Sequence, residues 1–237
     1  MISLLQILKE EIELIPRRSP EERNKNIQAS TNKKIQQYIK NGSKGDLDLY
    51  DTRIMSLPDN LKVGGNLYLS NTDITSLPDN LEVSGDLGLS ATKITSLPDN
   101  LKVNGDLDLS NTKITSLPDN LQVGKNIDLS QTPITSLPDN LKINGDLDLS
   151  YTKITQLPQG IKVKKDLFLR GSEITELPKN LVVGGKLYIY NTKITELPED
   201  LETKDLVINK NLFKKYKTKN NLKQKIPGVK GEIFSIN

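Results

Sequence analysis

The chain repeats one pattern of apolar and polar positions every 20 residues. A Leu-Pro dipeptide returns eight times in register, from Leu57 to Leu197. Ten residues before each dipeptide begins a pair of apolar residues separated by one other residue: Leu47/Leu49, Leu67/Leu69, Leu87/Leu89, Leu107/Leu109, Ile127/Leu129, Leu147/Leu149, Leu167/Leu169 and Leu187/Ile189. A ninth pair, Leu206/Ile208, arrives one residue early. Such a period predicts a solenoid whose units pack only against their neighbours.

Each unit can be interpreted position by position. The alternation of the apolar pair predicts a short strand, with both apolar side chains on one face and the middle residue on the other. Thr follows three residues later, replaced once by Ser172, and its hydroxyl can satisfy backbone groups where the chain leaves the strand. The next Ile points into the core, and Leu-Pro keeps the chain extended. Leu61 and Val63 close the back of the first unit, and Gly64-Gly65 turns the chain toward the next strand.

The motif L-x-L-x-x-T-x-I-x-x-L-P-x-x-L resembles the leucine-rich repeat family in its short bacterial form. The resemblance covers residues 44–208, with Thr where the family has Asn. A second departure is that the Leu three residues before the strand is absent, and Val or Ile stands four residues before it. The resemblance implies a parallel sheet whose concave face is the usual ligand surface. A parallel β-helix with two short strands per turn is the alternative. Nine strands about 4.8 Å apart would give a sheet about 40 Å long.

The two ends are predicted to cap the solenoid, whose core is otherwise exposed there. Residues 1–43 form a helical N-terminal cap in this prediction. One amphipathic helix is expected between Ile2 and Leu14, and a second begins at the capping sequence Ser19–Glu22. A third helix is expected at Ile35–Ile39 and ends at Asn41-Gly42.

Residues 209–237 form a basic C-terminal cap in the same prediction. Leu212, Phe213, Tyr216 and Leu222 could line one face of a helix, and Ile233–Ile236 reads as a short strand. Eight Lys residues in this segment face one acid, Glu232. The net charge is +3 for residues 1–43, −7 for residues 44–208 and +7 for residues 209–237. An acidic solenoid is therefore expected between two basic ends.

Composition removes several function classes. The chain has no Cys and no His, which excludes disulfides, thiolate metal sites and the usual general base. Aromatic residues make up 4% of it, less than an ordinary globular core uses. A flat, solvated strand surface offers no pocket that would shift pKa values, and the glycine-aspartate repeat of calcium β-rolls is missing. We therefore expect no enzyme activity, no cofactor and no metal, calcium included.

Neither a membrane span of about 20 apolar residues nor a secretory signal peptide is recognisable in the sequence. The expected location is therefore the cytosol, either bacterial or of a host cell. We expect a monomer.

The outward strand positions carry the candidate binding residues. Acidic side chains dominate the outward positions of the first units. Large aromatic residues and an Arg interrupt this acidic pattern in the later units, and Tyr151 is a further aromatic departure from the repeat next to them. Like charges on adjacent strands destabilise the sheet unless a basic partner relieves them, and exposed aromatics are typical interface anchors. The predicted protein-binding residues are Asp46, Asp48, Tyr50, Tyr68, Asp86, Asp106, Asp108, Asp128, Asp146, Asp148, Asp166, Phe168, Arg170, Tyr188 and Tyr190.

The leading hypothesis is a non-enzymatic module that binds a basic protein surface. The resemblance implies a relation to bacterial effectors that act as scaffolds and to other bacterial or phage-encoded repeat proteins. A phage or bacterial factor that sequesters a host protein would fit this relation. One alternative is nucleic-acid binding through Lys214, Lys215, Lys217, Lys219 and Lys223, or mimicry of nucleic-acid charge by the acidic ladder. Another is a structural rod in a larger assembly. The repeated Asp could also be a product of repeat duplication that keeps the sheet soluble.

Overall fold

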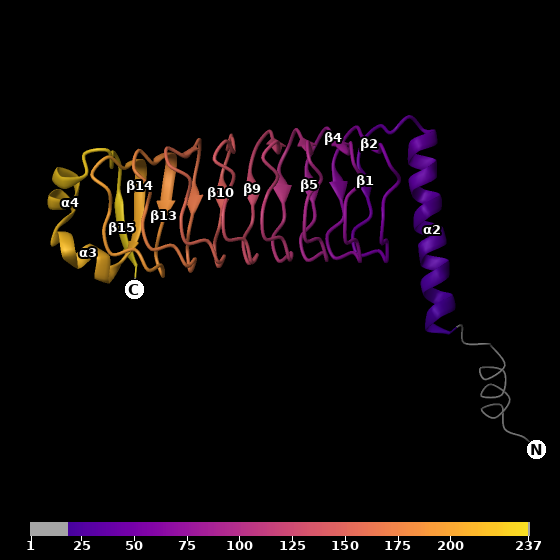
Figure 1. The fold of residues 1–237 in the computed structure, drawn as a ribbon, viewed down its shortest axis with the longest axis horizontal. Coiled ribbons are helices and arrows are strands. Elements are labelled where there is room, and N and C mark those ends of the chain that lie inside the picture. Colours follow the sequence, from indigo (N-terminus) through magenta and orange to yellow (C-terminus); the bar gives the residue numbers. More distant parts are fainter. Residues whose placement is uncertain (1–18, 237) are drawn as a thin grey trace, which may run out of the picture.

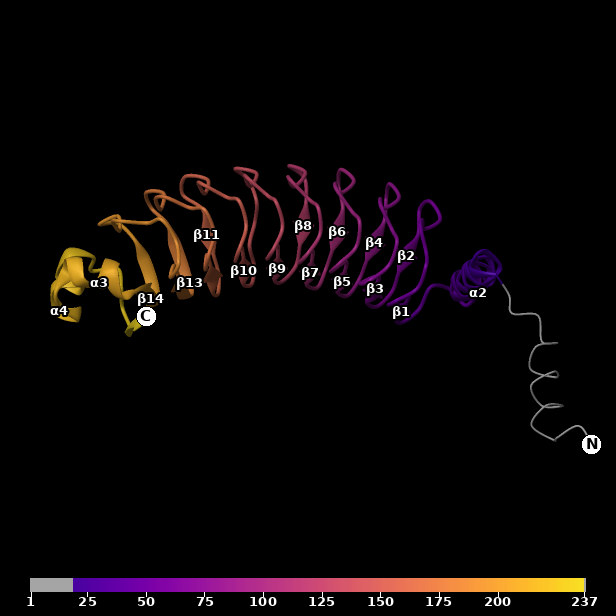
Figure 2. The ribbon, with the colours of Figure 1, turned by 90° about the horizontal axis from the view of Figure 1, so that it is seen from below.

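A computed structural model describes residues 19–236 as a parallel solenoid with helices at both ends. Each 20-residue turn contributes a short strand to a continuous sheet, and most turns add a second short strand on the opposite side. Figure 2 shows the turns stacked along a gentle arc, with the continuous sheet on the inner, concave side. Its path is β1-β3-β5-β7-β9-β10-β12-β13-β14-β15, one strand more than the nine expected.

All strand pairs are parallel, and from β1 to β13 the register advances by one repeat from strand to strand. The last two steps depart from the repeat, because Leu187 pairs with Leu206 and Leu206 pairs with Ile233. The concave strands are β1 (Leu47–Asp48), β3 (Leu67–Tyr68), β5 (Leu87–Gly88), β7 (Leu107–Asp108), β9 (Ile127–Asp128), β10 (Leu147–Asp148), β12 (Leu167–Phe168), β13 (Val182–Tyr188), β14 (Glu202–Asn209) and β15 (Ile233–Ile236). The short convex strands are β2 (Lys62–Val63), β4 (Glu82–Val83), β6 (Lys102–Val103), β8 (Gln122–Val123) and β11 (Lys162–Val163). The first residues of β13 and β14 continue this convex series, and the two strands then run on into the concave sheet.

The core is a set of buried apolar columns that run along the solenoid. Leu67, Leu69 and Ile74 are 0% exposed, and their equivalents in the other turns are buried in the same way. The Thr column was also predicted correctly. Each of these hydroxyls, from Thr52 to Thr192 and including that of Ser172, donates to the carbonyl three residues before it, at 2.6–2.8 Å. The buried hydroxyls thereby satisfy backbone oxygens where the chain leaves the sheet.

A single helix, α2 (Pro20–Lys40), lies beside the first turn (Figure 1). The expectation of two helices in this stretch is wrong, because the structure has one. The expected start at Ser19–Glu22 and the expected end at Asn41-Gly42 are confirmed. The helix continues because Ile35 is buried in the core, while the Tyr38 hydroxyl accepts from the N–H of Gly64 at 3.1 Å. The helix expected between residues 2 and 14 lies outside the described residues.

Two short helices cover the other end. The residues expected on one helix lie on α3 (Lys210–Tyr216) and α4 (Lys219–Lys225). The chain breaks between them because Lys217 has a positive φ of 63° and Thr218 caps a new helix. The strand Ile233–Ile236 is confirmed as β15. None of the helices in residues 19–236 is long and apolar enough to cross a membrane.

The convex strands are interrupted at one junction, between β8 and the turn that contains Ile143. At the preceding junctions, Asn104 and Gly124 donate their backbone N–H to the previous convex strand at 3.0 and 2.9 Å. At the interruption the side-chain amide of Asn144 bonds to the carbonyl of Val123 instead, at 3.1 Å. Pro133 belongs to the same turn as Ile143 and has no N–H, whereas Lys113 donates to the turn before it at 3.1 Å.

This junction is therefore held by the concave sheet more than by the convex side. Leu141 is only partly buried, although the equivalent Leu residues are buried. A polar groove of about 650 Å³, with Gln122 and Asn144 among its lining residues, opens there.

We expect the amide of Asn144 to exchange with solvent at least tenfold faster than that of Asn104. Asn104 is a matched control, because it is the same residue type at the same repeat position with its inter-turn hydrogen bond intact. Local opening needs less free energy where fewer backbone bonds must break. Residue-resolved hydrogen exchange measures both amides, and equal protection of the two would contradict a weakened junction.

Candidate functional site

The outward side chains of the concave sheet form three rows along the solenoid. The entry row precedes the first buried residue of each strand: Asp46, Asn66, Asp86, Asp106, Asn126, Asp146, Asp166, Lys186 and Asp205. The central row lies between the buried pair: Asp48, Tyr68, Gly88, Asp108, Asp128, Asp148, Phe168, Tyr188, Val207 and, on the last strand, Phe234. The exit row follows the pair: Tyr50, Ser70, Ser90, Ser110, Ser130, Ser150, Arg170, Tyr190 and Asn209.

The entry row is a hydrogen-bonded ladder between turns. Seven successive oxygens, from Asp46 to Asp166, each accept the backbone N–H of the entry-row residue one turn ahead, at 2.7–2.9 Å. Asp205 does the same for Glu232 at 2.7 Å. The predicted site residues Asp46, Asp86, Asp106, Asp146 and Asp166 therefore stabilise the stacking of the turns through one carboxylate oxygen.

Replacement of Asp106 by Ala should destabilise the fold by about 1–3 kcal/mol, because the N–H of Asn126 loses its acceptor in a half-buried position. Asp106→Asn should cost much less, since an amide oxygen fills the same role at Asn66 and Asn126. Denaturant unfolding of both variants measures the difference. Equal destabilisation by Ala and Asn would show that charge, rather than the acceptor, is needed there.

The acids of the central row make a different kind of contact. Asp108, Asp128 and Asp148 stand on neighbouring strands in direct register. One oxygen of each accepts the backbone N–H of the exit-row Ser two residues on, at 2.8–2.9 Å. Asp48 accepts the N–H of Tyr50 in the same way, at 3.0 Å. These bonds stay within a turn, so they orient the carboxylates on the sheet without linking turns.

Partial burial raises the pKa of Asp128 above its usual value, and the flanking carboxylates of Asp148 and Asp108 raise it further. The hydrogen bonds from Ser130 oppose this shift but do not cancel it. A raised carboxyl pKa means that the ionised group destabilises the folded state at neutral pH. That penalty disappears as the pH falls through the folded-state pKa toward the unfolded value of about 3.9.

We therefore expect Asp128→Asn to stabilise the protein at pH 7, by about 0.2–1 kcal/mol for each like-charge pair removed. The stability difference between the variant and the parent should shrink as the pH is lowered toward about 4, because the parent carboxyl then becomes neutral. Thermal unfolding as a function of pH checks this. A difference that stays constant with pH would contradict an origin of the penalty in the ionised, partly buried carboxylate.

Aromatic side chains occupy the same row beyond Asp148. The rings of Phe168 and Tyr188 are stacked, with centroids 4.5 Å apart and planes 11° apart. Val207 and Phe234 follow in register on β14 and β15. Val207 is buried, whereas Phe234 is 44% exposed. The Lys186 ammonium lies 5.7 Å from the centroid of the Phe234 ring. Phe234 was missed as a site residue, although the alternation that begins with buried Ile233 already placed it on an outward position.

Arg170 completes this cluster from the exit row. Its guanidinium lies 5.2 Å from the ring centroid of Tyr151 and 5.3 Å from that of Tyr190. Such cation–π contacts hold the side chain in place without neutralising its charge. The structure thus brings together Phe168, Arg170, Tyr188 and Tyr190 of the predicted set and adds Tyr151.

The other predicted aromatics lie apart from this cluster. Tyr50 is 61% exposed and Tyr68 is 38% exposed, and both stand on the first two turns. The amide of Asn66 donates to the Tyr68 hydroxyl at 2.6 Å. Gly88 and the three central acids separate these two tyrosines from Phe168 along the row, so the predicted aromatics form two groups rather than one.

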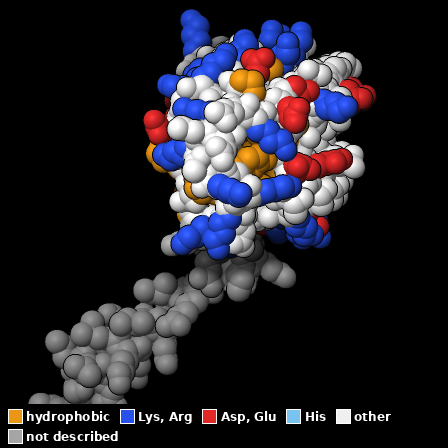
Figure 3. Space-filling view, turned by 90° about the vertical axis from the view of Figure 1, so that its left-hand side faces the viewer, with side chains coloured by type: hydrophobic (Ala, Val, Ile, Leu, Met, Phe, Trp, Pro, Cys, Tyr) orange, Lys and Arg blue, Asp and Glu red, His pale blue; other side chains and the backbone are white. Residues whose placement is uncertain are grey.

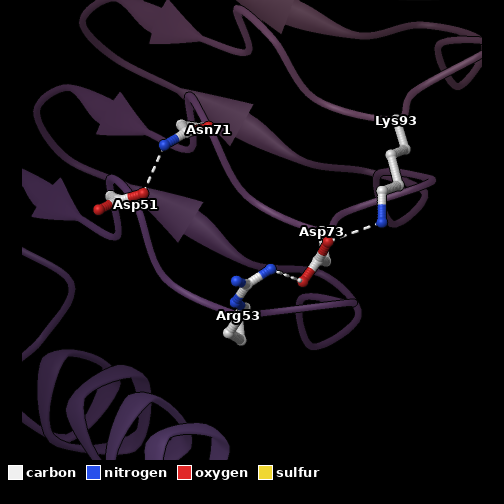
Figure 4. Close-up of polar contacts among 5 residues, drawn as sticks. All are labelled: Asp51, Arg53, Asn71, Asp73 and Lys93. Carbon is white, nitrogen blue, oxygen red and sulfur yellow. Dashed lines mark hydrogen bonds and ion pairs between the residues drawn. The ribbon is translucent and has the colours of Figure 1, made fainter. Parts of the chain in front are cut away.

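Exposed polar contacts also link the first turns outside these rows (Figure 4). Asp73 accepts from Lys93 at 2.7 Å and from Arg53 at 3.3 Å, and both contacts lower its pKa, that from Lys93 more strongly. Asn71 donates to Asp51 on the turn before it. Ion pairs as exposed as these contribute little to stability. They join neighbouring turns, and we do not include them in the candidate binding surface.

The C-terminal Lys residues spread over the end face formed by α3 and α4 (Figure 3). Lys215 pairs with Glu196 at 3.1 Å, and Lys219 pairs with Glu232 at 3.4 Å. Lys214 and Lys217 are exposed, and Lys223 is half-buried. This basic surface belongs to the end of the solenoid, whereas the acidic and aromatic rows belong to its concave face. Within residues 19–236, no three acidic side chains are grouped so that they could share a metal ion.

Comparison with proteins of known structure identifies the fold. The leucine-rich repeat domain of a Shigella effector matches with a TM-score of 0.58 and 20% sequence identity, over 98% of this chain and 98% of that chain. The fold is a leucine-rich repeat solenoid. No protein-family model and no curated protein sequence matches the chain.

Proposed function

We propose that this leucine-rich repeat solenoid is a non-enzymatic binding protein whose concave face holds a basic protein surface. The observation that carries the proposal is the row of Asp108, Asp128 and Asp148, three carboxylates in register on adjacent strands. Their mutual repulsion is relieved when cations from a partner lie over them. The aromatic cluster next to them supplies apolar contact area that electrostatics alone does not provide.

The likeness to the Shigella effector domain supports a role in which the solenoid itself is the binding part. A bacterial or phage factor that sequesters a host protein is the biological setting that fits such a domain. Arg170 and the stacked rings of Phe168 and Tyr188 are held by contacts within the protein, so little side-chain freedom remains to be lost on binding.

The triple variant Asp108→Asn/Asp128→Asn/Asp148→Asn should lose at least tenfold in affinity for the partner. Asn keeps an acceptor for the exit-row Ser N–H groups, so the change removes charge and leaves the local geometry. Affinity capture from candidate host lysate at low and high salt, with nuclease present, identifies a protein partner and its salt dependence. Quantitative binding to that partner then compares the variants.

The matched control is Asp99→Asn/Asp119→Asn/Asp139→Asn. This control changes the net charge by the same amount as the concave-face triple variant. Its three Asp residues are exposed and lie just before the convex strand positions, away from the concave face. Its affinity should stay within about twofold of the parent. Equal losses in the two triple variants would reduce the effect to overall charge, and no loss in either would remove the concave face from the proposal.

Nucleic-acid binding is the second candidate, and the Lys-rich end face favours it. Its Lys214, Lys217 and Lys223 are available to contact phosphates. Binding of this kind would be lost on nuclease treatment, and its salt dependence would weaken in Lys214→Gln/Lys217→Gln/Lys223→Gln. The concave-face triple variant would leave it unchanged, so the two candidates give opposite results with the same proteins.

A further inference from the structure

The central row carries two chemistries that are separated along the solenoid axis. Acidic side chains stand on β7, β9 and β10, and apolar or aromatic ones follow without interruption on β12, β13, β14 and β15. Asp148 is the direct neighbour of Phe168 in the sheet. A ligand that contacts both halves must therefore extend along the axis, because each strand places only one central side chain on the face.

The strand spacing selects the form of such a ligand. Adjacent central residues are about 4.8 Å apart along the axis. A helix presents one residue per turn on the same face about every 5.4 Å, whereas an extended strand presents one about every 6.7 Å. The mismatch per step is about 0.6 Å for a helix and about 1.9 Å for a strand. Over the six steps from Asp108 to Phe234, the mismatch accumulates to about 4 Å for a helix and about 11 Å for a strand, so only the helix drifts by less than one strand spacing.

We propose that the central row from Asp108 to Phe234 is a docking surface for one amphipathic helix of a partner protein, laid along the solenoid axis. The basic half of that helix lies over the three carboxylates, and its apolar half lies over Phe168, Tyr188 and Phe234. Val207, between Tyr188 and Phe234 in the row, is buried and does not contact the helix. The row spans about 29 Å, which corresponds to about 19 helical residues. The inference rests on the proposed function, because it specifies the partner for the same concave face.

Charge complementarity fixes which half goes where. The acidic half has exit-row Ser residues beside it, and Ser110 donates its hydroxyl to Asp108 at 2.7 Å. The apolar half is flanked by Lys186 and Arg170, whose ammonium and guanidinium groups lie near aromatic rings. The entry-row carboxylates of Asp166 and Asp205 flank the same half and offset these two cations. A basic segment is therefore attracted more strongly to the three carboxylates of the acidic end. An apolar segment gains contact area only at the aromatic end.

Synthetic peptides test the arrangement directly. The probe is a helical peptide of about 19 residues with Lys at the facing positions of one half and Leu at those of the other half. It is made in both chain directions, since the row does not fix the direction of the helix. The control has the same composition, with Lys and Leu alternating along the facing stripe. Affinities are measured by calorimetry with the full chain.

One of the two segregated peptides should bind at least tenfold more tightly than the alternating control. Phe168→Asn/Tyr188→Asn should abolish that preference, while its thermal unfolding stays close to that of the parent, because the central row already holds Gly88 and Asp residues. Phe168→Asp/Tyr188→Asp should instead favour a peptide with Lys at every facing position. The two variants keep the test informative if either one folds poorly.

Equal affinity for segregated and alternating peptides would overturn the proposal, as would a preference that survives Phe168→Asn/Tyr188→Asn. The proposed function fails separately. If the natural partner ignores Asp108→Asn/Asp128→Asn/Asp148→Asn, the concave face is not its site; if it responds but the peptides show no preference, only the helix is excluded.

Discussion

The stacking of identical 20-residue turns is the constraint on which every feature of this protein depends. Backbone bonds such as that from the N–H of Leu69 to the carbonyl of Gly88, at 2.8 Å, recur along the concave sheet. The entry-row oxygens add a side-chain bond at each step, from Asp46 to Asp166. Because both sets fix the offset between turns at one repeat from β1 to β13, any residue type that recurs there in the sequence becomes a row on the surface. Each row of side chains on the surface therefore has its own chemistry.

The sequence was sufficient for features that follow from the period. The buried Leu columns, the Thr hydroxyls and the strand at Ile233–Ile236 all came from local pattern and elementary hydrogen-bond accounting. The continuity of α2 could not be read in this way, since it depends on the packing of Ile35 and Tyr38 against the first turn. Tertiary contacts of this kind override the local stop signals that a sequence offers.

The sequence did not distinguish the Asp residues of the entry row from those of the central row. Asp106 and Asp108 are two residues apart and both point outward, yet one bonds to the next turn and the other to its own. A signal was present: Asn66 and Asn126 alternate with Asp in the entry row, which indicates that an acceptor oxygen is needed there rather than a charge. Phe234 was not predicted as a candidate site residue because α3 and α4 separate β15 from β14 in the sequence. The last outward position of the sheet therefore does not follow the 20-residue period.

The acids of the central row are held in place by hydrogen bonds from their own turns. A carboxylate buried in a ladder would be neutralised or paired, whereas Asp128 accepts only from its own turn and keeps like-charged neighbours on both sides. The bonds from Ser130 lower its pKa and burial raises it, and burial prevails. The folded chain thus keeps an unfavourable charge row that cooperative stacking can sustain. Under the proposed function, a cation from the partner relieves this repulsion, and Phe168 and Arg170, the departures from the repeat next to this row, then distinguish one partner from another.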